Sequence, residues 1–95
     1  MQNNFPLGQI VQSIGGRDKG QNYIVVGHTA NRVLVVDGKY KLLAKPKQKN
    51  AVHLKRINVN DNEIATKLAQ GKKINDNMIY HTLYEYQKKS PKEGE

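Results

Sequence analysis

Between Gly8 and Ile57 the apolar residues form short runs, most of them β-branched, and turn residues lie between the runs. Runs of this kind lie at 8–13, 23–27, 32–36, 39–44 and 52–57. In the last run Val52 and Leu54 alternate with polar neighbours, which is the period of two expected of a strand. Five short strands at this spacing predict a mainly β fold, either a small barrel or a sandwich. Full closure would remove the unpaired edges that short strands otherwise expose.

Strong turn residues separate these runs. The glycine-rich segment 15–20 can adopt the positive φ angles that tight turns need. Asp37 and Gly38 form a hairpin signal between the third and the fourth run. Pro46 lacks a backbone donor, which makes 45–50 a loop rather than a strand.

The pattern becomes helical after Asn58. The segment 60–63 has the composition of a helix N-cap with a glutamate at position N3. Ile64 and Leu68 follow on one helical face, and Gly71 is a natural helix stop. A first short helix is therefore predicted here.

A second helix is predicted from Asn75, because Ile79, Leu83 and Tyr86 recur at helical spacing. The polar residues 88–95, which include proline and glycine, predict a disordered tail. We therefore expect three parts: a barrel over 7–57, a helical extension over 60–87 and a tail over 88–95.

Positive charge is concentrated in one part of the chain. The 95 residues include 16 Lys and Arg against 8 Asp and Glu, which gives a net charge of +8. Residues 39–57 hold seven of these cations and no acid, so this window alone contributes +7. The seven are Lys39, Lys41, Lys45, Lys47, Lys49, Lys55 and Arg56. Such a block indicates a surface that faces a polyanion, and a solvated lysine-rich loop is the alternative.

The spacing of these cations favours contacts with a nucleic-acid backbone. Lys39 and Lys41 would share one strand face, with Tyr40 on the other. Every second residue of 45–49 is a lysine, which keeps these cations on one side if the loop is extended. Lysines suit backbone phosphates, because affinity there comes from charge neutralisation and counterion release.

Two further features extend this candidate RNA-binding site. Arg17 and Lys19 in the glycine turn are a second contact point, since an arginine can bind a phosphate bidentately or stack on a base. Tyr40 suits base stacking and a place in the barrel wall equally well, and the sequence leaves both roles open.

No catalytic or metal-binding constellation is recognisable. The segment 15–20 has the glycine spacing of a phosphate loop but lacks the Lys and Ser or Thr that follow it there. The three histidines are not at metal-ligand spacing, and cysteine is absent. Asp18 and Asp37 are the only acids before residue 58, and both lie in turn contexts where aspartate bonds its own backbone. We therefore expect a protein that is not an enzyme and that takes no cofactor or metal.

The stretch from Gly8 to Gly27, GQIVQSIGGRDKGQNYIVVG, resembles the KOW motif, with Gly20 as its central glycine. Residues 32–38, which end in Val-Val-Asp-Gly, are similar to the third strand of that motif. Over 7–57 the chain resembles the small bacterial KOW-domain RNA-binding proteins, which are similar to the fourteenth large-subunit ribosomal protein of archaea and eukaryotes. This resemblance implies an SH3-like barrel that contacts ribosomal RNA. Transcription elongation factors also use KOW motifs, partly for protein contacts.

We therefore predict a five-stranded SH3-like barrel of the KOW type, followed by two short C-terminal helices. The expected function is binding of ribosomal RNA or of a ribosome-associated complex, without catalysis. The alternative is a protein-interaction module of the transcription or translation machinery, in which an apolar helix face with Tyr80, Tyr84 and Tyr86 docks on a partner. A nucleotide-processing enzyme is a third class, which phosphate release would reveal.

The N-terminal residues and the aliphatic stretches bear on localisation. The chain begins without a basic region or a long apolar run, which differs from a secretory signal. Its aliphatic stretches are too short to span a bilayer. We therefore expect a cytoplasmic protein that makes no membrane contact.

Overall fold

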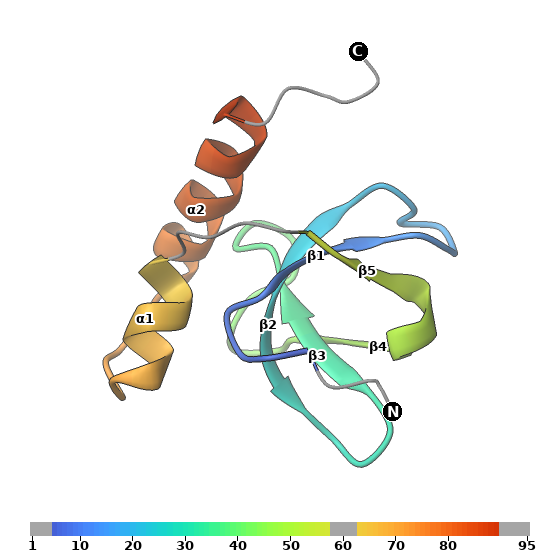
Figure 1. Ribbon diagram of the computed structural model, residues 1–95, viewed down its shortest axis with the longest axis horizontal. Helices are drawn as coiled ribbons and strands as arrows, with labels where there is room; N and C mark the ends of the chain where they lie inside the picture. Colours follow the sequence, from blue (N-terminus) through green and yellow to red (C-terminus); the bar gives the residue numbers. More distant parts are fainter. Residues whose placement is uncertain (1–4, 58–62, 90–95) are drawn as a thin grey trace.

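The computed structural model describes residues 5–57 and 63–89 of the chain. An antiparallel sheet of five strands and two C-terminal helices make up this described part (Figure 1). The strands are β1 (Ile10–Ser13), β2 (Asn22–His28), β3 (Val33–Val36), β4 (Lys47–Lys49) and β5 (Leu54–Arg56). A 3-10 turn, η1 (Ala51–His53), joins the last two strands, and the helices are α1 (Glu63–Ala69) and α2 (Asp76–Lys89). The prediction of a mainly β module followed by two short helices is confirmed.

The strands lie in the order β4-β3-β2-β1-β5, so that β4 and β5 form the two edges. Within the described residues β4 pairs with β3 alone and β5 pairs with β1 alone. The hydrogen-bonded sheet is therefore not closed, and the predicted closed barrel is not observed. Both edge strands have only three residues, which keeps the unpaired edges short without closure. The predicted strand 52–57 starts as η1 and becomes β5 only at Leu54.

The fourth strand lies later in the chain than predicted. The prediction of a strand over 39–44 is wrong, because Asp37 captures the backbone donors of this segment. Its Oδ1 accepts hydrogen bonds from the backbone N–H groups of Lys39, Tyr40 and Lys41 at 2.8–2.9 Å. These donors are therefore not available to pair with a neighbouring strand. The chain continues as a loop, and β4 forms at Lys47–Lys49, inside the segment predicted as a loop.

Both faces of the sheet are buried. Tyr23 and Val25 of β2 pack into one apolar cluster together with residues of β1, β3, η1 and β5. Ile24, from the same strand, packs on the opposite face into a second cluster that includes Ile79 and Leu83 of α2. Because β2 is buried on both sides, its sequence is a nearly continuous apolar run rather than an alternating one.

The helices cover the second face of the sheet (Figure 1). At Gly8, whose φ is +89°, an added Cβ would lie 2.4 Å from the Cα of Ala65. The chain that leads into β1 therefore packs directly against α1. The predicted helical extension shares a core with the sheet and is not a separate body. None of the described helices is long and apolar enough to cross a membrane.

The predicted start of α2 is confirmed, whereas its C-terminal end lies beyond the predicted boundary. The Asn75 side-chain oxygen accepts a hydrogen bond from the N–H of Met78 at 2.8 Å, which caps the start of α2. The N-cap predicted at 60–62 lies outside the described residues. α2 continues to Lys89, past the predicted boundary, and the rest of the predicted tail, 90–95, also lies outside the described residues.

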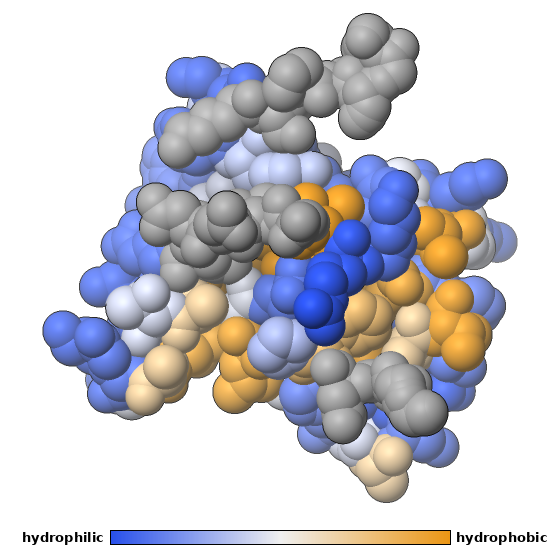
Figure 2. All heavy atoms as spheres, in the orientation of Figure 1, coloured by the Kyte–Doolittle hydropathy of each residue, from blue (hydrophilic) through white to orange (hydrophobic). Residues whose placement is uncertain are grey.

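Polar and apolar atoms are unevenly distributed over the surface. On the face seen in Figure 1, the helical part is mainly hydrophilic, whereas apolar atoms reach the surface over the sheet (Figure 2). Ile14 and Val52 are exposed apolar residues of this module, and the N–H of Ile14 donates to the carbonyl of His53 beside Val52.

Candidate nucleic-acid interface

The loop after β3 carries Lys39, Tyr40 and Lys41, and Asp37 holds its shape. Beyond the three bonds to its carboxylate, the N–H of Asp37 donates to the carbonyl of Lys41 at 2.9 Å. The other carboxylate oxygen accepts from the side chain of Gln21 at 3.2 Å. The prediction that Asp37 bonds its own backbone is confirmed. Tyr40 is 71% exposed, which excludes a place in a barrel wall and leaves it open to a base.

The same loop is fixed against the start of α2. Gly38 has a φ of +78°, and an added Cβ would lie 2.4 Å from the carbonyl oxygen of Asp76 and 2.6 Å from the nitrogen of Tyr80. Only glycine permits this combination of backbone angle and close approach. The N–H of Leu43 also donates to the Asp76 carboxylate at 2.8 Å. Together these contacts hold the loop and α2 in one relative position.

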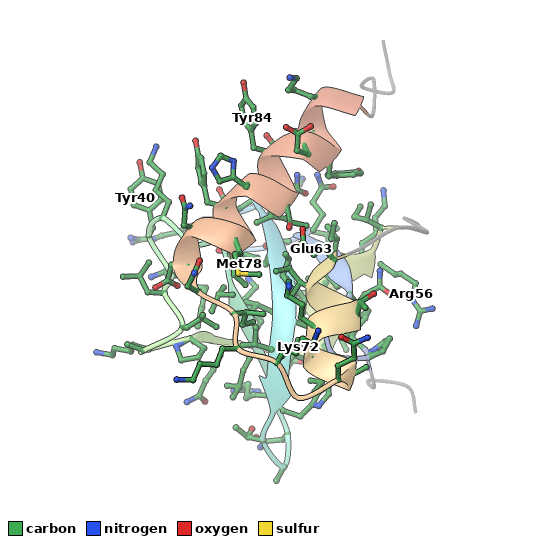
Figure 3. The ribbon with its side chains drawn as sticks, turned by 90° about the vertical axis from the view of Figure 1, so that its left-hand side faces the viewer. Tyr40, Arg56, Glu63, Lys72, Met78 and Tyr84 are labelled. Atoms are coloured by element: carbon green, nitrogen blue, oxygen red, sulfur yellow. The ribbon has the colours of Figure 1, made fainter. Side chains whose placement is uncertain are left out.

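A cleft of about 220 Å³ lies between this loop and α2. Its walls include Asn22 at the start of β2, Lys39 and Tyr40 in the loop, and Tyr80 and Tyr84 on α2. The Tyr80 and Tyr84 rings are nearly parallel, with 16° between their planes and 6.3 Å between their centroids. Figure 3 shows Tyr40 and Tyr84 on the same side of the molecule. The cleft therefore has an aromatic rim that two distant segments supply.

Cations lie over two of these rings. The Nζ of Lys39 is 5.1 Å from the centroid of Tyr40, and the Nζ of Lys88 is 5.6 Å from that of Tyr84. Both distances are within the range of a cation–π interaction. In the wall of the cleft, the side-chain oxygen of Asn22 is buried and has no hydrogen-bond partner among the described residues.

Lys49 does not belong to an exposed basic face. Its residue is 8% exposed, and its Nζ lies 3.0 Å from the Oδ1 of Asp18 and 3.4 Å from the carbonyl oxygen of Gly15. This corrects the prediction that placed Lys49 on the RNA-facing side with the neighbouring lysines. A buried ammonium group requires a partner, and Asp18 supplies it inside the protein.

Asp18 connects the turn after β1 with β2 and β4. Its carboxylate also accepts hydrogen bonds from the hydroxyls of Ser13 at 2.8 Å and Tyr23 at 2.5 Å. Burial by itself raises the pKa of Asp18, but the hydrogen bonds from Tyr23, Lys49 and Ser13 outweigh it and hold the pKa well below its usual range. Burial, reinforced by the bond to Asp18, raises the pKa of Tyr23. The prediction that Asp18 bonds its own backbone is wrong, because side chains donate to its carboxylate instead. Its partner Lys49 is 31 positions away, so the sequence did not indicate this contact.

The other predicted cations do not form one face. Arg56 and Tyr40 lie on opposite sides of the molecule in Figure 3. β5 carries Arg56 along β1, whereas the loop that carries Tyr40 packs on α2. Of the predicted cations other than Lys49, two are half-buried, Lys41 and Lys47, and the rest are exposed: Arg17, Lys19, Lys39, Lys45, Lys55 and Arg56. The acid-free window is therefore divided between separate surfaces.

Sequence reasoning did not identify the cleft. It grouped Tyr80, Tyr84 and Tyr86 as one partner-docking face, but Tyr86 is half-buried against the second cluster. The spacing of four between Tyr80 and Tyr84 was the available signal, because it places both rings on one helix face. No local pattern indicates that the loop with Tyr40 meets that face.

Among residues 5–57 and 63–89, no group of three or more potential metal ligands is present. No protein-family model matches the chain, and no curated protein matches it significantly.

Proposed function

We propose that this protein is a non-catalytic RNA-binding protein of the KOW type that contacts ribosomal RNA or a ribosome-associated complex. The centre of the proposed surface is a set of three residues in the loop between β3 and β4, termed the loop cations: Lys39, Lys41 and Lys45. The net charge of +8 provides the general attraction to a polyanion.

The observation that carries this proposal is that, within residues 5–57 and 63–89, the loop cations form no ion pair with an acidic side chain. Asp37 is the nearest acid in sequence, and its carboxylate accepts hydrogen bonds from backbone donors and from Gln21. Among the described residues, ion pairs join Lys49 to Asp18 and Lys67 to Glu63, and neither pair involves a loop cation. Unpaired lysines beside an exposed tyrosine suit contacts with phosphates and bases.

Two features of the sheet support the KOW-type assignment. β1 pairs with both β2 and β5, and the turn between β1 and β2 contains Gly20 at a φ of +95°, where the motif has its central glycine. The cluster around Tyr23 and Val25 draws residues from β1, β2, β3, η1 and β5. We propose that the sheet curves around this cluster as an SH3-like barrel with incomplete hydrogen-bonded closure.

A salt titration of binding to ribosomal RNA tests the proposal. The logarithm of the affinity should fall linearly with the logarithm of the salt concentration, because each neutralised phosphate releases counterions. Charge reversal of two loop cations, Lys39→Glu with Lys45→Glu, should weaken binding and reduce this slope. Lys72→Glu with Lys73→Glu is the matched control, since both residues are exposed and lie outside the loop.

Either of two results would contradict the proposal. One is an affinity that does not depend on salt, and the other is an equal loss in the two charge-reversed variants. Competition with heparin separates RNA recognition from general attraction to polyanions, because heparin carries charge without bases.

The exposed rings of Tyr80 and Tyr84 support one alternative, a protein-interaction module of the transcription or translation machinery. Retention of a specific protein after nuclease treatment, together with no salt-dependent RNA binding, would favour it.

A further inference from the structure

We infer that the cleft between the loop and α2 binds one unstacked base of a single-stranded RNA segment, with Tyr84 and Tyr40 as stacking partners. This inference rests on the proposed RNA-binding function and adds the chemical class of its ligand. It also gives α2 a direct role in binding, because Tyr80 and Tyr84 of this helix line the cleft.

The size and walls of the cleft fit a nucleobase. Its volume of about 220 Å³ is below the roughly 300–1,000 Å³ of pockets that hold drug-sized ligands. Tyr40, Tyr80 and Tyr84 give it aromatic walls, and single-stranded RNA is recognised by stacking of splayed bases on such rings. Duplex RNA keeps its bases stacked inside the helix and would leave these rings uncontacted.

The cleft also has a polar wall at the start of β2. Asn22 is 8% exposed, and its side-chain oxygen has no partner among the described residues. Because this oxygen is shielded from solvent, a base in the cleft does not reach it in the observed arrangement, so the fit of a base depends on the rings and the cations. The neighbouring Gln21 side chain is tied to Asp37, so this part of the wall is held in place.

Phosphate contacts are available beside the rings. Lys39 lies over Tyr40 and Lys88 lies over Tyr84, so a cation flanks the cleft on the loop side and on the helix side. A base between them would place its backbone phosphates within reach of these flexible ammonium groups. A purely apolar partner segment would gain nothing from the two cations, and this charge arrangement favours RNA as the occupant.

The site is preorganised by contacts that do not involve the ligand. Gly38 packs against the backbone of α2, and Asp76 accepts a hydrogen bond from the N–H of Leu43. These contacts fix the loop that carries Tyr40 relative to the helix that carries Tyr84. Binding therefore does not have to order the two walls, which reduces its entropic cost.

The test compares two synthetic strands of equal length and charge, a single-stranded RNA and a strand of the same backbone with abasic positions. The full chain should bind the strand with bases more tightly. Because the protein has no tryptophan, its fluorescence comes from its five tyrosines and should be quenched more by the base-containing strand than by the abasic strand.

Tyr84→Ala should lower the affinity for the base-containing strand by about 5-fold or more, which corresponds to the loss of one base–aromatic stack. Its affinity for the abasic strand and its salt slope should stay unchanged. Tyr84→Phe, which keeps the ring, should remain within about 2-fold of the wild type. Val52→Ala, at an exposed apolar residue outside the cleft, is the control and should change neither affinity.

Equal binding of the two strands, or an unchanged affinity of a folded Tyr84→Ala protein, would overturn this inference and leave RNA binding by the loop cations intact. Failure of both strands and of ribosomal RNA to bind in a salt-dependent way would overturn the proposed function, and this inference with it.

Discussion

Replacement of Lys49 by methionine separates a structural lysine from an RNA-binding one. Methionine keeps a long flexible side chain but removes the ammonium group. The Asp18 carboxylate would then lose its ion pair and one hydrogen bond, while the hydroxyls of Ser13 and Tyr23 would still donate to it. We expect a large loss of stability and little direct effect on RNA binding.

The size of the loss follows from the burial of the pair. The side chains of Lys49 and Asp18 are 9% and 20% exposed, so water screens them less than a surface pair. Removal of one partner from a buried pair costs about 3–5 kcal/mol, whereas an exposed pair contributes about 0–1 kcal/mol. Because Asp18 keeps two donors and some solvent contact, we expect about 2–3 kcal/mol. For a domain of this size, that lowers the Tm by roughly 10–20 °C.

Urea denaturation near neutral pH measures the free energy of unfolding. Lys45→Met is the matched control. Because Lys45 is exposed, its replacement should lower the free energy of unfolding by less than about 0.5 kcal/mol. RNA affinity, measured where both variants are folded, should fall for Lys45→Met and stay near the wild-type value for Lys49→Met. A double-mutant cycle with Asp18→Asn should give a coupling free energy of about 1 kcal/mol or more.

A Lys49→Met protein with wild-type stability and weakened RNA binding would refute this reasoning. It would mean that the ammonium group is available to phosphates and that its contact with Asp18 contributes nothing. Loss of stability without coupling to Asp18→Asn would refute the ion pair as the cause.

Three further predictions concern the same contacts and the second core. The folded-state pKa of Asp18 is lowered, so the ionised carboxylate stabilises the fold above its unfolded pKa of about 3.9, and this stabilisation is lost as the pH falls below that value. In urea denaturation from about pH 6 to about pH 3, the free energy of unfolding should therefore fall less steeply for Asp18→Asn than for the wild type. Gly38→Ala should lower the free energy of unfolding by at least about 1–2 kcal/mol from the left-handed backbone alone, and its clash with α2 should also weaken RNA binding. Gly71→Ala is the control that isolates the backbone strain, because an added Cβ there meets nothing within 4 Å. Leu83→Ala should cost about 2–4 kcal/mol. Amide NMR signals of β2 and helical circular dichroism should still report one transition, because both elements share a core. Two separate transitions would contradict the shared core.

Much of the fold was predictable because local patterns encode it. The β-branched runs located β1, β2, β3 and β5 to within a few residues, and the cap at Asn75 marked the start of α2. The error at 39–44 has a specific cause. Tyr40 is the only strong strand-former in this segment, and the Asp37 carboxylate accepts three of the segment's backbone hydrogen bonds. A side-chain contact of that kind does not appear in an alternating pattern.

The candidate site was predictable only in part. The acid-free window of cations is visible in the sequence, since charge can be counted along a chain. It could not separate Lys45, which is exposed, from Lys49, which is buried against Asp18. The two lysines have the same chemistry and lie in the same segment, and only the partner across the fold distinguishes them.

By itself the sequence determined the strand-rich module, the two helices, the excess of positive charge and the turn roles of Asp37 and Gly20, because each of these depends on neighbours within a few residues. The tertiary structure alone decided that the sheet has buried cores on both faces, that Lys49 is internal, and that Tyr40 and Tyr84 meet at one cleft. These features depend on contacts between residues far apart in the chain. Such contacts form only when the whole chain packs, so no local pattern of residues encodes them.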